Sequence, residues 1–121
     1  MLRMQGRVST ANNGGFIQVR QRGFAPWATD ASGLKVEAKG NGETYYIFLR
    51  TPDLNRFSWS FRATFEVGEN WQEIELPFET FKPSSADMPQ SFDPARVSSI
   101  GIVAYGREHE ADVSVRSIAL Y

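Results

Sequence analysis

Three arginines on predicted strands carry the most informative chemistry in this sequence. Arg20, Arg50 and Arg62 each occur on the more polar face of a segment whose side chains alternate in character. Successive side chains of a β-strand point to opposite faces, so alternation assigns each residue to a face. Arginine binds anions through two parallel hydrogen bonds, and aromatic side chains such as Tyr46 and Phe48 stack on sugar rings. The set predicts a site for a carboxylate, a phosphate or a sugar on one concave sheet.

A second interpretation of these arginines is purely structural. Exposed sheet faces commonly carry cross-strand pairs of opposite charge, and Glu37, Glu73 and Glu75 lie on polar faces of other predicted strands. Each arginine would then be neutralised by a carboxylate and would support the sheet instead of a site. The sequence leaves both interpretations open.

Two residues of predicted loops are further ligand-binding candidates. Asn13 belongs to an Asn-Asn-Gly-Gly turn signal, and Trp27 lies in a loop that also contains a proline. The Asn13 amide and the Trp27 ring are groups that contact ligands. In the alternative interpretation, Asn13 is a turn former and Trp27 covers one end of the fold.

The sequence predicts no catalytic or metal site. His109, placed in a predicted charged turn over 106–111, is the only histidine, whereas a catalytic metal normally takes three protein ligands with histidine prominent. Glu73 and Glu75 share one face at about 6–7 Å, as in glycosidase pairs, but acids on exposed strands are usually only solvated. No serine has the sharp-turn context of a catalytic triad. We therefore expect no enzymatic activity and no cofactor.

Short alternating segments between turn signals predict an all-β protein. The segments 44–50 and 57–65 predict a hairpin around a proline-containing loop. Its apolar faces predict that Leu49, Trp59 and Phe61 are almost fully buried. The other predicted strands are 2–8, 16–22, 34–39, 71–76, 97–105 and 113–120. About eight such strands predict an antiparallel β-sandwich of the jelly-roll type.

The irregular segments carry their own predictions. Phe78 and Phe81 are expected to plug an irregular crossing, and residues 82–94 are expected to form a long surface loop. Asp93 followed by proline predicts one capped helical turn. A phase slip near Arg116 predicts a β-bulge in the last strand.

Length and charge exclude several classes of protein. The 121 residues predict a single domain over 1–121, and the absence of cysteine excludes a disulfide framework. With 13 basic and 14 acidic residues, the net charge of −1 argues against a partner such as nucleic acid or an anionic membrane. No apolar run approaches the roughly 20 residues that span a bilayer, and no signal peptide is visible. We expect a soluble protein, cytoplasmic if the source is bacterial.

A resemblance to a known family rests on four ordered stretches. They are Gly6-Arg7-Val8-Ser9 before Asn12-Asn13-Gly14-Gly15-Phe16 and Val19-Arg20; Gly40-Asn41-Gly42 with Tyr45 and Arg50; Trp71 with Pro77-Phe78 and Phe81; and Val97-Ser98-Ser99-Ile100-Gly101. In this order they resemble the complex I intermediate-associated protein 30 family, from Gly6 to the end of the chain.

The resemblance implies a galactose-binding domain-like jelly roll with no established catalytic activity. It also implies a protein partner, such as assembly intermediates of NADH:ubiquinone oxidoreductase. The alternative, from another functional class, is a carbohydrate-binding module that takes a small sugar or an anionic ligand, because the same fold hosts many of these.

The N-terminus departs from the family pattern. Family domains generally start some tens of residues earlier, so the resemblance implies that this chain lacks the first part of the domain. The predicted strand 2–8 would then be an open sheet edge, which is a template for pairing with another chain. We expect self-association as a homodimer; the alternative is a monomer that closes its own edge.

Overall fold

The computed structural model describes the chain except for residues 1, 9–15, 23–25, 57 and 106–108, and it gives only the backbone of residues 7–8, 16–22, 105 and 109. The strands are β1 (Leu2–Val8), β2 (Phe16–Arg22), β3 (Gly33–Gly40), β4 (Thr44–Arg50), β5 (Phe61–Glu66), β6 (Gln72–Pro77), β7 (Lys82–Pro83), β8 (Ser99–Tyr105) and β9 (His109–Leu120). Two short 3-10 helices, η2 (Phe78–Thr80) and η3 (Pro94–Arg96), complete the described elements.

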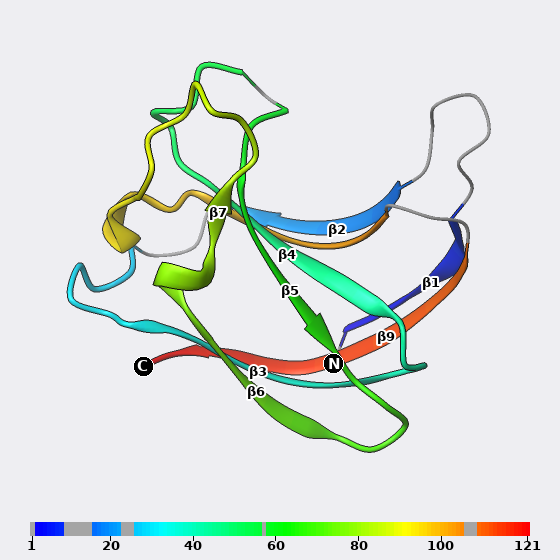
Figure 1. The fold of residues 1–121 in the computed structure, drawn as a ribbon. Coiled ribbons are helices and arrows are strands. Elements are labelled where there is room, and N and C mark those ends of the chain that lie inside the picture. The colour runs from blue at the N-terminus through cyan, green and yellow to red at the C-terminus, as the bar shows by residue number, and fades with distance from the viewer. Residues whose placement is uncertain (1, 9–15, 23–25, 57, 106–108) are drawn as a thin grey trace.

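The strands form two antiparallel sheets that pack face to face (Figure 1). The four-stranded sheet has the order β1-β9-β3-β6, and the five-stranded sheet has the order β2-β8-β4-β5-β7. Sequence neighbours β1 and β2 belong to different sheets, as do β3 and β4, so the chain crosses repeatedly between the layers. The predicted antiparallel β-sandwich of jelly-roll type is confirmed. None of the described helices is long and apolar enough to cross a bilayer.

The core lies between the sheets and follows the predicted alternation. Tyr45, Ile47 and Leu49 of β4 are fully buried, as are the inward residues of β3. Phe61 of β5 retains only 1% exposure. The inward faces predicted for Leu49 and Phe61 are therefore confirmed.

The second strand of the predicted hairpin is shorter than expected. β5 begins at Phe61, and a turn precedes it, because the Trp59 amide donates to the Arg56 carbonyl at 3.0 Å. Buried Leu54 anchors the connecting loop, so the chain leaves the sheet after β4 and returns late. The prediction that Trp59 is almost fully buried is wrong, since this side chain is only half-buried. Residue 57 lies outside the described residues.

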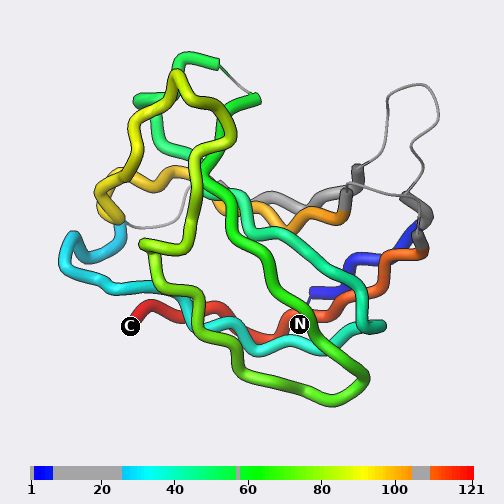
Figure 2. Tube along the Cα trace, in the orientation of Figure 1, coloured from blue at the N-terminus to red at the C-terminus, as the bar shows by residue number. Residues whose placement is uncertain are grey.

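The loop after β4 lies beside the long loop that follows β7 (Figure 2). The Ser84 amide donates to the Ser60 carbonyl at 3.0 Å, and the Ser60 amide donates to the Ser84 hydroxyl at 3.1 Å. The expected surface loop over 82–94 thus begins as the short strand β7 and buries Met88. The predicted cap is confirmed, because the Asp93 carboxylate accepts from the Ala95 amide at 2.9 Å at the start of η3.

The last strand contains the predicted bulge but starts earlier than predicted. The register with β3 passes from Glu37 opposite Ser117 to Ala38 opposite Val115, so Arg116 is the extra residue. β9 begins at His109, which was expected in a turn, because residues from His109 onward pair with β1. The remainder of that predicted turn lies in 106–108, outside the described residues.

Candidate functional site

The arginines and aromatics meet on the outer face of the five-stranded sheet. Strand register makes one continuous row in which Arg20 pairs with Gly101, Gly101 with Phe48, Phe48 with Arg62, and Arg62 with Lys82. Directly paired residues of antiparallel strands share a face. Their neighbours in β4 and β5 form the core, so Phe48, Arg62 and Lys82 occupy positions on the outward face.

We call the set Tyr46, Phe48, Arg50 and Arg62 the arginine face. The Arg62 guanidinium carbon lies 4.2 Å from the centroid of the Phe48 ring. The Tyr46 and Phe48 rings meet edge to face, with centroids 5.9 Å apart and planes at 77°. These four side chains are half-buried, as expected of groups that pack against one another at a surface. The sheet thus brings together four of the residues proposed from the sequence.

Neutral oxygens orient both arginines of this face. Arg62 donates through Nε to the Ser60 hydroxyl at 2.7 Å and through Nη2 to the Ser58 carbonyl at 3.2 Å. Arg50 donates through Nη2 to the Arg56 carbonyl at 3.0 Å. Hydrogen bonds to neutral oxygens hold a guanidinium group in position without cancelling its charge. These bonds therefore hold two guanidinium groups beside the aromatic rings.

The carboxylates suggested as partners of these arginines lie on the other sheet. Glu37 belongs to β3, and Glu73 and Glu75 belong to β6, so all three carboxylates lie on the four-stranded sheet. Glu37 forms an ion pair with Arg116 of the same sheet. The predicted cross-strand pairs with the arginine face are not formed, because that face belongs to the other layer.

Strand β8 supplies a floor beside the arginine face that the sequence analysis did not include in the site. Its outward positions Ser99, Gly101 and Val103 pair with Arg50, Phe48 and Tyr46, respectively. All three are buried although they point away from the core. Small or short side chains therefore lie below the larger side chains of β4. The sequence pattern that could have revealed these positions is Ser-Ile-Gly inside an otherwise apolar strand.

The remaining sequence candidates lie elsewhere or outside the described residues. Trp27 packs on the core and stacks on Phe78, with centroids 5.9 Å apart and planes at 14°, as in the alternative interpretation of a plug. Arg20 pairs with Gly101 through its backbone, and its side chain is not described. Asn13 falls in the segment 9–15, which the structure does not describe.

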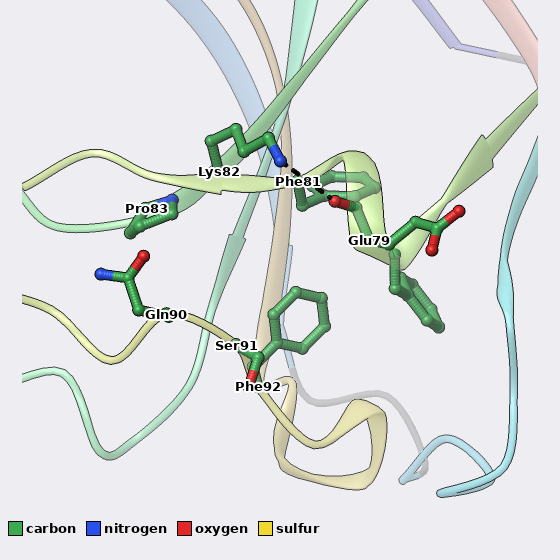
Figure 3. Close-up of a pocket in the computed structure, with 8 residues that line it drawn as sticks. Glu79, Phe81, Lys82, Pro83, Gln90, Ser91 and Phe92 are labelled. Carbon is green, nitrogen blue, oxygen red and sulfur yellow. Dashed lines mark hydrogen bonds between the residues drawn. The ribbon is translucent and has the colours of Figure 1, made fainter.

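A depression of about 200 Å³ lies at the β7 end of the sandwich (Figure 3). Its apolar lining comes from Phe78, Phe81 and Phe92, and Glu79 and Lys82 are among its polar residues. Phe92 also contacts Phe61, with centroids 4.8 Å apart. The predicted role of Phe78 and Phe81 as apolar plugs is confirmed, because both pack in this aromatic cluster.

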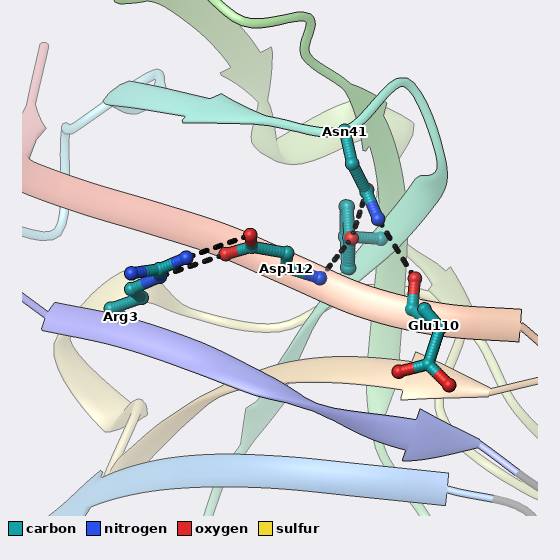
Figure 4. Close-up of polar contacts among 5 residues, drawn as sticks. Arg3, Asn41, Glu110 and Asp112 are labelled. Atoms are coloured by element: carbon teal, nitrogen blue, oxygen red, sulfur yellow. Dashed lines mark hydrogen bonds and ion pairs between the residues drawn. The ribbon is translucent and has the colours of Figure 1, made fainter.

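A second depression, of about 300 Å³, lies on the outer face of the four-stranded sheet and is lined by Arg3, Lys39, Gly40, Glu69, Asp112 and Ser114. Arg3 and Asp112 form a two-bond ion pair there, with both N–O distances 2.9 Å (Figure 4). The hydrogen bond from Arg3 holds the pKa of the Asp112 carboxyl below its usual range. Arg3 and Asp112 of this depression thus satisfy each other.

A polar network around the buried Tyr45 ties the β3–β4 turn to β9 (Figure 4). The Tyr45 hydroxyl donates to Asn41 Oδ1 at 2.5 Å and accepts from the Asp112 amide at 2.9 Å. Asn41 Nδ2 donates to the Glu110 carbonyl at 2.8 Å. Burial raises the pKa of Tyr45, so the phenol stays protonated and serves as both donor and acceptor. This network has a structural role.

Among the described residues, no group of three or more histidine, cysteine, aspartate or glutamate side chains is arranged to hold a metal ion. The arginine face offers guanidinium groups and rings, which bind anions and flat or apolar surfaces.

Solved structures with a similar fold come from a carbohydrate-binding module. The family 11 module of the cellulosomal cellulase Lic26A-Cel5E of Clostridium thermocellum superposes with a TM-score of 0.74 at 14% identity, covering 98% of this chain and 81% of that one. The Clostridium thermocellum module in complex with a β-1,3-1,4-mixed-linked tetrasaccharide gives 0.73 at 15% identity, covering 98% and 82%. Identities this low show the fold alone. No curated protein sequence matches the chain.

The sequence also matches a family model. Residues 1–115 match the model of Complex I intermediate-associated protein 30. The match includes the four stretches on which the resemblance rests and extends to the first residue of the chain. The chain therefore belongs to the Complex I intermediate-associated protein 30 family.

Proposed function

We propose that this chain is a non-enzymatic binding module that engages a protein partner through the arginine face. The observation that carries the proposal is the arrangement of Arg50 and Arg62, which neutral oxygens hold beside two aromatic rings on an outward sheet face. Arginine and tyrosine are enriched where proteins bind each other tightly. The family name indicates intermediates of complex I assembly as the class of partner.

The chemistry of the face supports binding without catalysis. A guanidinium group does not lose its proton near neutral pH, so Arg50 and Arg62 cannot act as general bases. The face offers charge, hydrogen-bond donors and ring surface, which are sufficient for recognition.

A sugar-binding function is the second candidate, because the similar folds are carbohydrate-binding modules. Sugar binding requires an open ring face on which the pyranose can stack. Arg62 covers one face of Phe48 at 4.2 Å, and Tyr46 meets the same ring edge to face. This packing leaves less ring surface for a sugar. We therefore propose protein binding ahead of sugar binding.

Site-specific photo-cross-linking tests the proposal. Thr64 is exposed and pairs with Tyr46, so a benzophenone amino acid at this position reports on the arginine face. A benzophenone at Glu73, which is exposed on the four-stranded sheet, is the matched control. In cells of the native host we expect a discrete protein adduct from position 64 and none from position 73. Adducts from position 73 alone, or from neither position, would contradict the proposal.

A polysaccharide-binding assay distinguishes the sugar-binding candidate. Affinity electrophoresis in mixed-linked β-glucan should leave the mobility of the protein unchanged. Retardation that disappears in a Tyr46→Ala variant would replace the protein partner with a polysaccharide.

A further inference from the structure

The last strand of the five-stranded sheet covers only part of β5. β5 extends over the six residues Phe61–Glu66, whereas β7 pairs only with Phe61 and Arg62. Among the described residues, no strand pairs with the rest of β5 on that side. Figure 1 shows β5 continuing past β7 toward its C-terminal end. The sheet therefore has an edge that is open over residues 63–66.

The alternation of hydrogen bonds identifies which backbone groups face this open edge. The Ser84 amide donates to the Ser60 carbonyl at 3.0 Å and continues the β5–β7 register, so Ser60 points to the β7 side. Residues that bond the same neighbouring strand recur at every second position of an antiparallel strand. Arg62, Thr64 and Glu66 therefore face the same side as Ser60. Since β7 covers Arg62, the amide and carbonyl groups of Thr64 and Glu66 point to the open edge.

The exposure of the side chains agrees with this assignment. Thr64 and Glu66 are exposed, whereas Arg62, beside β7, is half-buried. No described backbone group bonds Thr64 or Glu66 on the open side. Unpaired amide and carbonyl groups along a strand edge are a template for another extended chain. The chemistry of this edge therefore selects a polypeptide in the extended conformation.

The open edge is continuous with the arginine face. Thr64 pairs with Tyr46 and lies two residues from Arg62 on the same outward face. A strand laid along the edge would thus lie beside the surface proposed for the partner. The edge of β6, on the other sheet, carries the exposed carboxylates Glu73 and Glu75, and charged side chains protect an edge against pairing. The observations therefore favour β5 as the edge that the partner reaches.

Taking the proposed function as given, we infer that the partner adds an extended segment to this edge as a further strand, antiparallel to β5 and in line with β7. Main-chain hydrogen bonds to Thr64 and Glu66 hold the segment, and its side chains alternate between the two faces. The residue opposite Glu66 is a cation, because opposite charges are favourable in cross-strand pairs. The residue opposite buried Phe65 faces the core side and is apolar.

Hydrogen exchange of individual amide groups tests the inference. In the free protein, the amides of Thr64 and Glu66 should exchange much faster than those of Ala63 and Phe65, which face β4. When the parent protein is mixed with the protein captured by the benzophenone at position 64, exchange at Thr64 and Glu66 should slow at least about tenfold. Protection of these two amides in the dilute free protein would overturn the inference, because the edge would already be covered.

Proline substitution tests the same hydrogen bonds from the side of the protein. Thr64→Pro removes an amide that faces the open edge and leaves the bonds to β4 in place, so affinity for the captured partner should fall about tenfold. Thr64→Val keeps the backbone and the branched side chain, and affinity should stay within about twofold. Circular dichroism and thermal unfolding verify that each variant is folded.

Glu75→Pro is the matched control on the edge of the other sheet. The Phe78 amide donates to the Ser32 carbonyl of the chain entering β3, so alternate residues of β6 face β3 and Glu75 faces away. Glu75→Pro therefore removes an edge-facing amide from β6 and should leave partner affinity unchanged. Equal losses in Thr64→Pro and Glu75→Pro, or in Thr64→Pro and Thr64→Val, would overturn the added strand.

The outcomes separate this inference from the proposed function. A partner adduct at position 64 with no slowing of exchange at Thr64 and Glu66 would refute the added strand and leave the protein-binding function standing. The absence of an adduct would contradict the proposed function, and the inference that rests on it would fall as well. Slowing of both amides as the concentration of this chain alone rises would assign the edge to a second copy and overturn the partner segment.

Discussion

The outer faces of the two sheets use arginine in opposite ways. On the four-stranded sheet, Arg3 pairs with Asp112 and Arg116 pairs with Glu37. Arg116 and Lys39 also lie over the Trp71 ring, at 4.3 Å and 5.1 Å from its centroid. On the five-stranded sheet, the hydrogen bonds that orient Arg50 and Arg62 run to hydroxyl and carbonyl oxygens.

Strand register sets the neighbours of each arginine, and these neighbours determine whether the arginine pairs with a carboxylate. Carboxylates and cations share the β9–β3–β6 surface, and exposed pairs of this kind contribute about 0–1 kcal/mol each. That surface therefore adds solubility and local order and little stability. On the other sheet the register places aromatic and small residues beside the cations.

The largest expected effect concerns the core beneath the arginine face. Phe61 precedes Arg62 and is 1% exposed, so Phe61→Ala should lower the free energy of unfolding by about 3–5 kcal/mol. Trp59 is only half-buried in the turn before β5, so Trp59→Ala should lower the free energy of unfolding by less. Urea denaturation measures both variants. A loss below about 1 kcal/mol for Phe61→Ala would mean that the inward face of β5 has been misassigned.

The next effect concerns the polar network between the sheets. Tyr45→Phe removes the hydroxyl that bonds Asn41 and the Asp112 amide, and both partly buried hydrogen bonds are lost. We expect a loss of about 1–3 kcal/mol in the free energy of unfolding. Tyr46→Phe, which changes the same atom on the arginine face, is the control and should cost less. Equal effects in the two variants would remove the structural role of the network.

A third prediction concerns the edge of the four-stranded sheet. β1 pairs with β9 on one side, and no other described strand pairs with it on the second side. An open edge is a template for another strand, so we predict self-association that buries roughly 1,000 Å² or more. Light scattering over a wide concentration range measures the mass. A constant value near 13.6 kDa would contradict this prediction.

The smallest effect is the pH dependence of an exposed ion pair. Arg3 lowers the pKa of Asp112, so the pair contributes stability above the unfolded-state pKa of about 3.9. That contribution is lost as the pH falls through the lower pKa of the folded state. The stability difference between the parent protein and an Arg3→Gln variant should therefore shrink as the pH falls below about 3.9. A stability difference that grows as the pH falls would contradict the predicted direction of the pKa shift.

Local alternation was sufficient to predict the described strands other than β7, the inward faces of Leu49 and Phe61, and the bulge at Arg116. It also placed Tyr46, Phe48, Arg50 and Arg62 on outward faces, because the alternation of side chains along a strand can be read from the sequence alone. It could not predict that Glu37 and Glu73 lie on the other sheet, because the alternation within one strand does not show which distant strands pair with each other. Trp59 was mispredicted because its apolar character continued the alternation into a segment that the buried Leu54 draws into a loop.

The most direct test of the contrast between the two faces is a chemical-shift map of the amide groups during titration with the protein partner that the benzophenone at position 64 captures. We predict that the largest changes occur at β4 and β5 around Phe48 and Arg62, and that Glu37 and Arg116 are unaffected. Changes centred on β3 and β9 would contradict the account, because they would place recognition on the sheet where Arg3 and Arg116 already pair with carboxylates.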